Sequence, residues 1–256
     1  MKVAILAGGL GSRLSEETRN KSKAMVDIGN KPVLWHIMSF YAHFGFKEFV
    51  IALGYRGETI KQFFAEQNFS RIDLNGEAGP RPQERERWQN QEWTVDLIDT
   101  GHNTQNGGRI KRLGPYLGNS TFMLTWCDGL SDVDLDRLLD FHRDHGRLAT
   151  LTAIHPPGRF GRLALEGSRV ASFSEKTTDP EEWINGAYFV LEPGVLDYIA
   201  GDDTQWEREP LETLAGSGEL MAYRHRFFWQ CMDTLKEAQS LNSLWISGRA
   251  PWKVWS

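Results

Sequence analysis

The sequence has 256 residues, 40% of them hydrophobic and 25% charged, which is enough for one α/β domain with a full core. Its net charge of −5 and the lack of a basic tract argue against a nucleic-acid partner, which needs a clustered Lys/Arg face. The apolar run at residues 1–7 is too short for a signal peptide or a membrane span. We therefore expect a single cytoplasmic domain over residues 1–256, without a membrane partner.

Short apolar runs alternate with helical patterns in the first half of the chain. Strands are expected at residues 3–7, 49–53, 95–98 and 121–125. Helices are expected at residues 33–44, 59–66 and 134–145, the last with Asp132 as its N-cap. This alternation predicts βαβ units and a mixed, mainly parallel sheet flanked by helices. Ligands bind such sheets beyond the carboxyl ends of the strands, so chemistry is expected after Ala7, Leu53 and Trp126.

The periodicity changes in the second half of the chain. Turn-forming and charged residues at about 70–93 predict a long loop or flap. Residues 162–165 and 169–173 flank a Glu-Gly-Ser turn and predict a small antiparallel hairpin. A strand is expected at 187–191 and a helical segment at about 234–256. The expected fold is therefore α/β with a small antiparallel element.

A glycine-rich segment directly follows the first expected strand. It reads Leu6-Ala7-Gly8-Gly9-Leu10-Gly11-Ser12-Arg13-Leu14. Glycines let backbone N–H groups approach phosphate oxygens, and the guanidinium of Arg13 can bind two of those oxygens. The segment lacks the Gly-Lys-Ser/Thr of a Walker A loop, and Leu14 replaces the third glycine of a dinucleotide fingerprint, which disfavours an oxidoreductase. A phosphate-binding loop is one interpretation, and an ordinary tight strand–helix turn is the other.

A lysine segment, Lys21-Ser22-Lys23, lies about ten residues further on. If Lys23 folds back beside Arg13, the two cations can balance a triphosphate and stabilise departing pyrophosphate. Solvated surface lysines are the plain alternative.

Two aspartates are candidate ligands for Mg²⁺. Asp128 ends an apolar strand and precedes a glycine, and Asp233 follows Met232. Mg²⁺ usually takes one or two carboxylates together with phosphate oxygens. Taken alone, Asp233 is more typical of the N-cap of the helix expected near Thr234, and the two roles do not exclude each other.

Two further pairs are candidate ligands of a phosphorylated substrate. Glu175-Lys176 follows the expected hairpin, and Asn185-Gly186 precedes the strand expected at 187–191. Lys176 can bind a phosphate, while Glu175 and Asn185 can bind hydroxyl groups. A surface ion pair between Glu175 and Lys176 is the alternative.

Taken with Asp99-Thr100-Gly101, Gly107-Gly108-Arg109 and the segment at 250–255, these residues resemble the sugar-1-phosphate nucleotidyltransferases. Over essentially its whole length, the chain resembles the bacterial glucose-1-phosphate cytidylyltransferases within that family. The resemblance implies a Rossmann-like (GT-A-like) fold, a Mg²⁺-dependent transfer from CTP to glucose 1-phosphate, and a homo-oligomer whose neighbouring subunit helps to close the site.

The resemblance also implies a role for each candidate residue. Arg13, Lys23, Asp128 and Asp233 would be catalytic, and the two aspartates would bind Mg²⁺. The nucleotide would contact Leu6, Ala7, Gly8, Gly9, Gly11, Ser12, Arg13, Lys23, Gly108 and Arg109. The sugar phosphate would contact Glu175, Lys176, Asn185 and Gly186.

The chain departs from this family at the proposed site. Ser22 and Ala24 stand where the family usually has prolines, so the lysine segment lacks their fixed φ angles. Cys127 replaces a usual glycine and Cys231 a usual proline; we expect both cysteines to be buried packing residues. Two alternatives therefore stay open: transfer to a different phosphorylated acceptor, or a catalytically silent nucleotide-binding relative.

Overall fold

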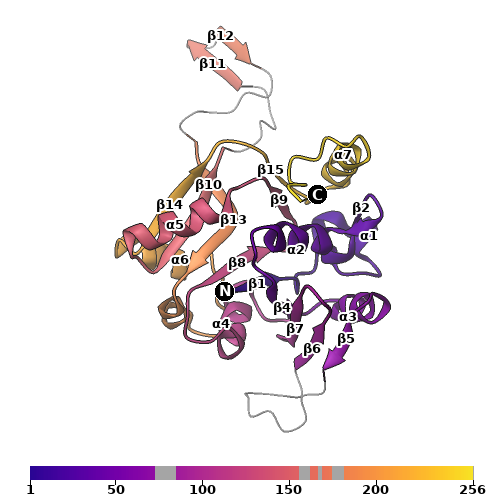
Figure 1. The fold of residues 1–256 in the computed structure, drawn as a ribbon. Helices are drawn as coiled ribbons and strands as arrows, with labels where there is room; N and C mark the ends of the chain where they lie inside the picture. Colours follow the sequence, from indigo (N-terminus) through magenta and orange to yellow (C-terminus); the bar gives the residue numbers. More distant parts are fainter. Residues whose placement is uncertain (73–84, 156–161, 167–168, 175–181, 256) are drawn as a thin grey trace.

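A computed structural model describes residues 1–72, 85–155, 162–166, 169–174 and 182–255 (Figure 1). The described residues form a mixed nine-stranded sheet in the order β14-β10-β13-β8-β1-β4-β7-β6-β5. Its parallel centre consists of β8 (Phe122–Trp126), β1 (Lys2–Leu6), β4 (Glu48–Leu53) and β7 (Thr94–Asp99). Antiparallel pairs flank this centre on both sides, so the predicted mixed α/β sheet is confirmed.

The flanking strands complete the sheet. One side carries β13 (Ile184–Leu191), β10 (Ala149–Ile154) and β14 (Leu220–His225), with β14 parallel to β10. The other side carries β6 (Arg85–Gln89) and β5 (Ser70–Ile72).

Alternate residues of β1 enter two hydrophobic clusters on opposite faces of the sheet. Val3 and Ile5 pack in one cluster, and Ala4 and Leu6 in the other. The first cluster also takes apolar side chains from α2 (Val33–His43), α3 (Gly57–Glu66), α5 (Leu135–His145) and α7 (Leu235–Ile246). The second takes them from α4 (Asn106–Leu117), η4 (Pro193–Tyr198) and α6 (Glu209–Gly216). The sheet is therefore covered on both faces, which leaves its strand ends as the place for a site.

Short elements lie between these layers. Near the N-terminus they are η1 (Ser12–Leu14), α1 (Ser15–Thr18), η2 (Lys23–Met25), and the pair β2 (Asp27–Ile28) and β3 (Lys31–Pro32). The predicted hairpin is confirmed as β11 (Arg162–Glu166) and β12 (Arg169–Ser174). A further antiparallel pair joins β9 (Gly129–Ser131) to β15 (Trp229–Cys231).

Several boundaries differ from the prediction. The expected loop at 70–93 contains β5 and β6, and its residues 73–84 lie outside the described part of the chain. Asp134 rather than Asp132 is the N-cap of α5, because the Asp134 carboxylate accepts a hydrogen bond from the Arg137 backbone N–H. The C-terminal helix ends at Ile246, well before residue 256. No helix in the described part of the chain is both long and apolar enough to cross a bilayer.

Candidate active site

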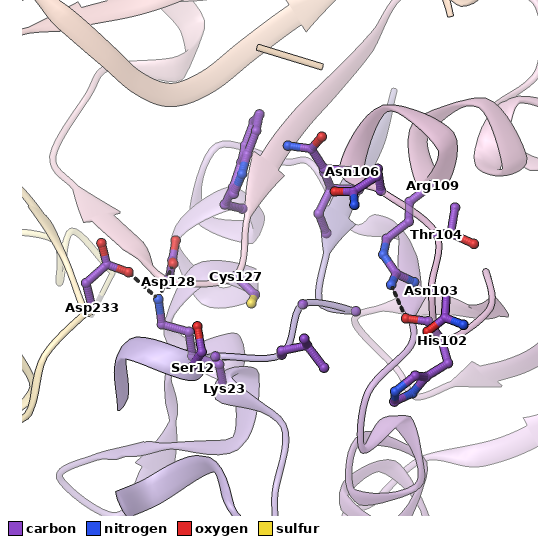
Figure 2. A pocket seen from close by; sticks show the side chains of 17 residues that line it. Ser12, Lys23, His102, Asn103, Thr104, Asn106, Arg109, Cys127, Asp128 and Asp233 are labelled. Atoms are coloured by element: carbon purple, nitrogen blue, oxygen red, sulfur yellow. Dashed lines mark hydrogen bonds and ion pairs between the residues drawn. The ribbon is translucent and has the colours of Figure 1, made fainter. Parts of the chain in front are cut away.

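A cavity of about 520 Å³ opens at the carboxyl ends of β1, β7 and β8 (Figure 2). This volume lies within the range of small-molecule sites. Its wall is made by residues from five separate stretches of the chain: Leu6, Gly8, Gly9, Leu10, Gly11, Ser12, Lys23, His102, Asn103, Thr104, Gln105, Asn106, Arg109, Trp126, Cys127, Asp128 and Asp233. The segments after Ala7 and Trp126 line this cavity as expected from the strand-end rule, whereas the residues directly after Leu53 do not line the cavity formed by the described residues.

The glycine-rich turn forms one wall of this cavity. Gly11 has a φ of 62°, a left-handed value that glycine adopts without strain. Gly8 lies against the guanidinium of Arg109, since a Cβ built on Gly8 would be 2.4 Å from Arg109 Nη1. Ala7 is buried behind the wall, and Arg13 lies in η1 with its side chain outside the described part. The predicted contact of Arg13 with phosphate therefore stays a prediction.

Lys23 lies between the two candidate metal ligands. Its Nζ donates hydrogen bonds to Asp128 Oδ2 at 2.5 Å and to Asp233 Oδ1 at 2.7 Å (Figure 2). Burial disfavours the charged lysine, but attraction to Asp128 and the hydrogen bonds to both carboxylates outweigh burial and raise the pKa of Lys23. Lys23 is therefore a firmly charged ammonium group.

The β9–β15 pair explains how two aspartates far apart in sequence meet. Gly129 pairs with Cys231 in this ladder, and the Met232 N–H donates to the Asp128 carbonyl at 2.8 Å. The next residue, Asp233, is thereby held beside Asp128.

The structure does not support the expected role of Asp233 as the N-cap of α7. Thr234 takes that role, and its hydroxyl and the Glu237 carboxylate form a reciprocal capping box. The Asp233 carboxylate can therefore face Lys23.

The two carboxylates fit the needs of a hard divalent cation. The Asp128 and Asp233 carboxylates approach the same atom, Lys23 Nζ, from separate parts of the chain, so a single small cation could contact both carboxylates. No cluster of three or more potential metal-binding His, Cys, Asp or Glu side chains occurs in the described ranges. Phosphate oxygens and water would therefore have to complete the shell, as is usual for Mg²⁺.

Arg109 lies on the other side of the cavity, in α4. Its Nη1 donates to the carbonyls of Leu53 (3.0 Å) and Gly101 (2.7 Å) and to Thr100 Oγ1 (2.7 Å). Burial lowers the pKa of this guanidinium. Arg109 thus ties the ends of β4 and β7 together beneath Gly8, and its predicted contact with phosphate stays a prediction.

The segment from His102 to Asn106 also lines the cavity and was not among the predicted site residues. It follows β7, whose carboxyl end lies beside that of β4, so the strand-end rule could have identified it. Gly108 lies behind this wall, where a Cβ would be 2.6 Å from Asp202 Cα. Gly108 therefore permits close packing of α4 and does not line the cavity.

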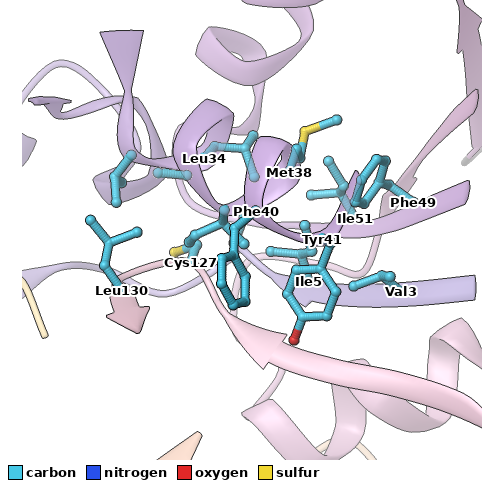
Figure 3. Packing of buried hydrophobic residues seen from close by; sticks show 14 of the residues in the cluster. Val3, Ile5, Leu34, Met38, Phe40, Tyr41, Phe49, Ile51, Cys127 and Leu130 are labelled. Atoms are coloured by element: carbon cyan, nitrogen blue, oxygen red, sulfur yellow. The ribbon is translucent and has the colours of Figure 1, made fainter. Parts of the chain in front are cut away.

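Cys127 packs mainly into the protein core. Figure 3 shows Cys127 near Leu34, Phe40 and Leu130, and the residue is 7% exposed. Burial, with a smaller effect of Asp128, raises the pKa of its thiol to about 12. The expected buried packing role is confirmed for Cys127 but is wrong for Cys231, which is only half-buried.

The predicted sugar-phosphate residues are only partly described. Asn185 and Gly186 lie within β13 and do not line the cavity formed by the described residues. Asn185 Oδ1 accepts a hydrogen bond from the Ala187 N–H, and the Gly186 carbonyl accepts one from Trp229 Nε1. Glu175 and Lys176 lie outside the described residues.

Comparisons with known proteins agree with this geometry. Residues 2–228 match the family model described as nucleotidyl transferase. The chain is 48% identical over 256 residues to the glucose-1-phosphate cytidylyltransferase of Salmonella typhi, and 41% identical over 256 residues to the probable glucose-1-phosphate cytidylyltransferase of Bacillus subtilis (strain 168). Both alignments cover 100% of each protein. The crystal structure of HddC from Yersinia pseudotuberculosis shares the fold, with a TM-score of 0.71 and 21% identity over 95% of this chain and 99% of that one. The chain therefore belongs to the nucleotidyl transferase family.

Proposed function

We propose that this nucleotidyl transferase moves the cytidylyl group of CTP to glucose 1-phosphate, giving CDP-glucose and pyrophosphate. The observation that carries the choice of substrates is the full-length similarity to glucose-1-phosphate cytidylyltransferases. The cavity supports the reaction class, because it combines a glycine-rich turn with a buried lysine and two carboxylates.

The proposed reaction is a direct in-line displacement. An oxygen of the sugar phosphate attacks the α-phosphorus of CTP and forms a new P–O bond. The bond from the α-phosphorus to the oxygen that bridges it to the β-phosphorus breaks, and pyrophosphate leaves with that electron pair. A phosphate monoester is largely dianionic near neutral pH because its second pKa is about 6, so the attacking oxygen needs no general base.

The residues of the cavity would supply positioning and charge compensation. The backbone N–H groups of the glycine-rich turn would hold the triphosphate. Lys23 would stabilise the charge of departing pyrophosphate, and Arg13 is proposed to assist it. Asp128 and Asp233 would hold Mg²⁺, which neutralises phosphate charge and polarises the α-phosphate when bound.

The partners and location in this proposal come from the resemblance. We propose that the enzyme acts in the cytoplasm and is a homo-oligomer in which a neighbouring subunit helps to close the nucleotide site. Light scattering of the purified chain tests the assembly, and a monomer with full activity would contradict it.

The decisive experiment tests donors against acceptors. CTP, UTP, GTP and ATP are each combined with glucose 1-phosphate and other sugar phosphates in the presence of Mg²⁺, and pyrophosphate release and product mass are measured. The proposal expects CDP-glucose as the main product. A different preferred acceptor would move the proposal to another sugar phosphate. Nucleotide binding without pyrophosphate release from any pair would indicate a silent relative.

A further inference from the structure

The turn between β4 and α3, together with the first turn of α3, contacts both chain segments that carry the proposed phosphate-binding groups of the cavity. The Tyr55 backbone N–H donates to the Gly8 carbonyl at 3.2 Å, which holds the glycine-rich turn. Thr59, the third residue of α3, reaches the lysine segment, because its Oγ1 accepts a hydrogen bond from the Ser22 backbone N–H at 3.1 Å. One short connection thus fixes two segments that are separate in sequence.

The orientation of the Thr59 hydroxyl is set within α3. Thr59 Oγ1 donates to the Arg56 carbonyl at 2.7 Å, so its single hydrogen is already used. An oxygen lone pair is therefore available to the Ser22 N–H. Because Thr59 lies in the first turn of a helix that packs in the core, this acceptor has a fixed position.

Ser22 links the fixed Thr59 hydroxyl to the next residue, Lys23. Ser22 is fully buried, and its Oγ lies 3.3 Å from the Ala7 carbonyl and 3.4 Å from the Ala24 nitrogen, within reach of hydrogen bonds to both. These two contacts are long, so the bond to Thr59 is the best formed of the three that link Ser22 to other groups through its N–H and hydroxyl. The Ser22 carbonyl also accepts a local hydrogen bond from the Met25 N–H at 2.8 Å. Lys23 follows directly and extends its ammonium group to the carboxylates of Asp128 and Asp233.

The backbone of Ser22 already has a φ that a proline would accept. Its φ is −61°, which is close to the value of about −65° that a proline ring imposes. A proline has neither an N–H group to bind Thr59 nor a hydroxyl group to bind Ala7. Hydrogen bonds in this chain therefore hold the conformation that a proline ring would hold.

We propose that Thr59, acting through Ser22, is a positioning residue that sets the location of the Lys23 ammonium group relative to the glycine-rich turn. The effect of Thr59 on turnover rests on the proposed function, whereas its effect on the position of the Lys23 side chain does not depend on that function. Thr59 lines no part of the cavity formed by the described residues, so its effect must pass through the lysine segment.

The first test compares two variants that separate the hydroxyl group from the shape of the side chain. Thr59→Val keeps the branched shape and loses the hydroxyl, while Thr59→Ser keeps the hydroxyl. Ser217→Ala is the matched control, because it removes a hydroxyl that donates to the carbonyl three residues earlier in α6. Misplacing a catalytic group by about 1 Å can cost on the order of a hundredfold in rate, so Thr59→Val should lower kcat by roughly tenfold to a hundredfold. Thr59→Ser should retain most of the wild-type kcat, and Ser217→Ala all of it.

A purely structural role predicts a different pattern. In that case, Thr59→Val would lower the melting temperature but leave kcat unchanged at saturating substrate. That result would overturn the inference. Equal losses of kcat in Thr59→Val and Thr59→Ser would overturn it as well, because the hydroxyl group would not be responsible.

A second readout does not depend on the proposed reaction. Acetylation of Lys23 by acetic anhydride, without nucleotide or metal, is measured by peptide mass spectrometry relative to the exposed Lys236. Lys23 is 9% exposed in the wild-type protein, so displacement of its side chain should raise its relative acetylation severalfold in Thr59→Val but not in Thr59→Ser. Unchanged acetylation in Thr59→Val refutes the inference even if the enzyme is active. Absence of wild-type turnover with CTP and glucose 1-phosphate would instead refute the proposed function and leave this readout valid.

Ser22→Pro tests the path between the two residues. This variant removes the N–H group that binds Thr59 while keeping the φ of Ser22. The loss of kcat caused by Thr59→Val should therefore shrink to about twofold or less in a Ser22→Pro background, as expected for two residues that share one interaction. The same loss in both backgrounds would show that Thr59 does not act through Ser22.

Discussion

Replacing Lys23 with methionine should destabilise the protein in a way that divalent cations reverse. Methionine keeps an unbranched apolar stem and removes only the charge that separates Asp128 from Asp233. The two bonded carboxylate oxygens lie 2.5 and 2.7 Å from one nitrogen and are therefore no more than 5.2 Å apart. At this separation and an effective dielectric constant of about 20, two unit charges repel by about 3 kcal/mol. The side chains of both aspartates are about four-fifths buried, so solvent screens them only in part.

The expected loss can be measured by thermal unfolding in EDTA. For a chain of this size, about 3 kcal/mol corresponds to a fall in Tm of roughly 6 to 12 °C. Millimolar Mg²⁺ should restore much of this loss in Lys23→Met, because the cation would take over the charge compensation. The wild-type protein should respond less, since Lys23 already compensates both carboxylates. Lys236→Met, at an exposed position, is the control. A wild-type Tm for Lys23→Met in EDTA would refute the reasoning.

Three further changes test other parts of the site and the core. Asp233→Asn should lower kcat by about a hundredfold or more while the circular dichroism spectrum is retained, and wild-type pyrophosphate release in saturating Mg²⁺ would exclude the ligand role. Gly8→Ala places a Cβ 2.4 Å from Arg109 Nη1. Calorimetry should therefore show weaker CTP binding, and urea unfolding should show that the free energy of unfolding falls by about 1 to 3 kcal/mol. Unchanged values would mean that the guanidinium moves aside easily. Burial lowers the pKa of His36 from 6.5 to about 4, so this side chain binds a proton more tightly in the unfolded chain than in the folded protein. The free energy of unfolding should therefore fall by about 3 kcal/mol as the pH drops from 6.5 to 4. Urea unfolding of His36→Gln should lack this slope, and parallel curves for the two proteins would contradict the assignment.

Periodicity predicts the elements whose burial follows a simple pattern. The helix expected at 33–44 is α2 (Val33–His43), and the strand expected at 49–53 is β4 (Glu48–Leu53), so both agree to within one residue at each end. Both elements are dominated by apolar side chains that enter the core.

The prediction missed α4, which contains three glycines and a proline among its twelve residues. Such a composition lowers helix propensity, and only tertiary contacts reveal why the helix forms. A Cβ on Gly107 would lie 2.6 Å from the Thr204 carbonyl oxygen, so the glycine lets α4 pack against the backbone near Thr204. This contact joins residues about a hundred positions apart and has no local signal.

Some residues of the site could likewise be predicted from local sequence patterns, while others depend on contacts between distant parts of the chain. The glycine-rich turn and Asp128 stand at places that a strand-end rule identifies in the sequence, and Lys23 was proposed because it follows that turn by about ten residues. Asp233 had two interpretations, as metal ligand or as N-cap. The spacing Thr234-x-x-Glu237 is itself a capping-box signature, so the sequence already contained the reason to assign the cap to Thr234.

What the sequence could not supply is the position of Asp233 in space. Asp233 reaches Lys23 because β15 pairs with β9, and each of these strands has only three residues. So short a ladder has no periodicity to detect, and its register depends on the fold around it. A shift of this register by one residue would turn alternate side chains to the other face and carry Asp233 away from Asp128. The pairing of Gly129 with Cys231 is therefore the structural feature on which the joint action of the two carboxylates depends.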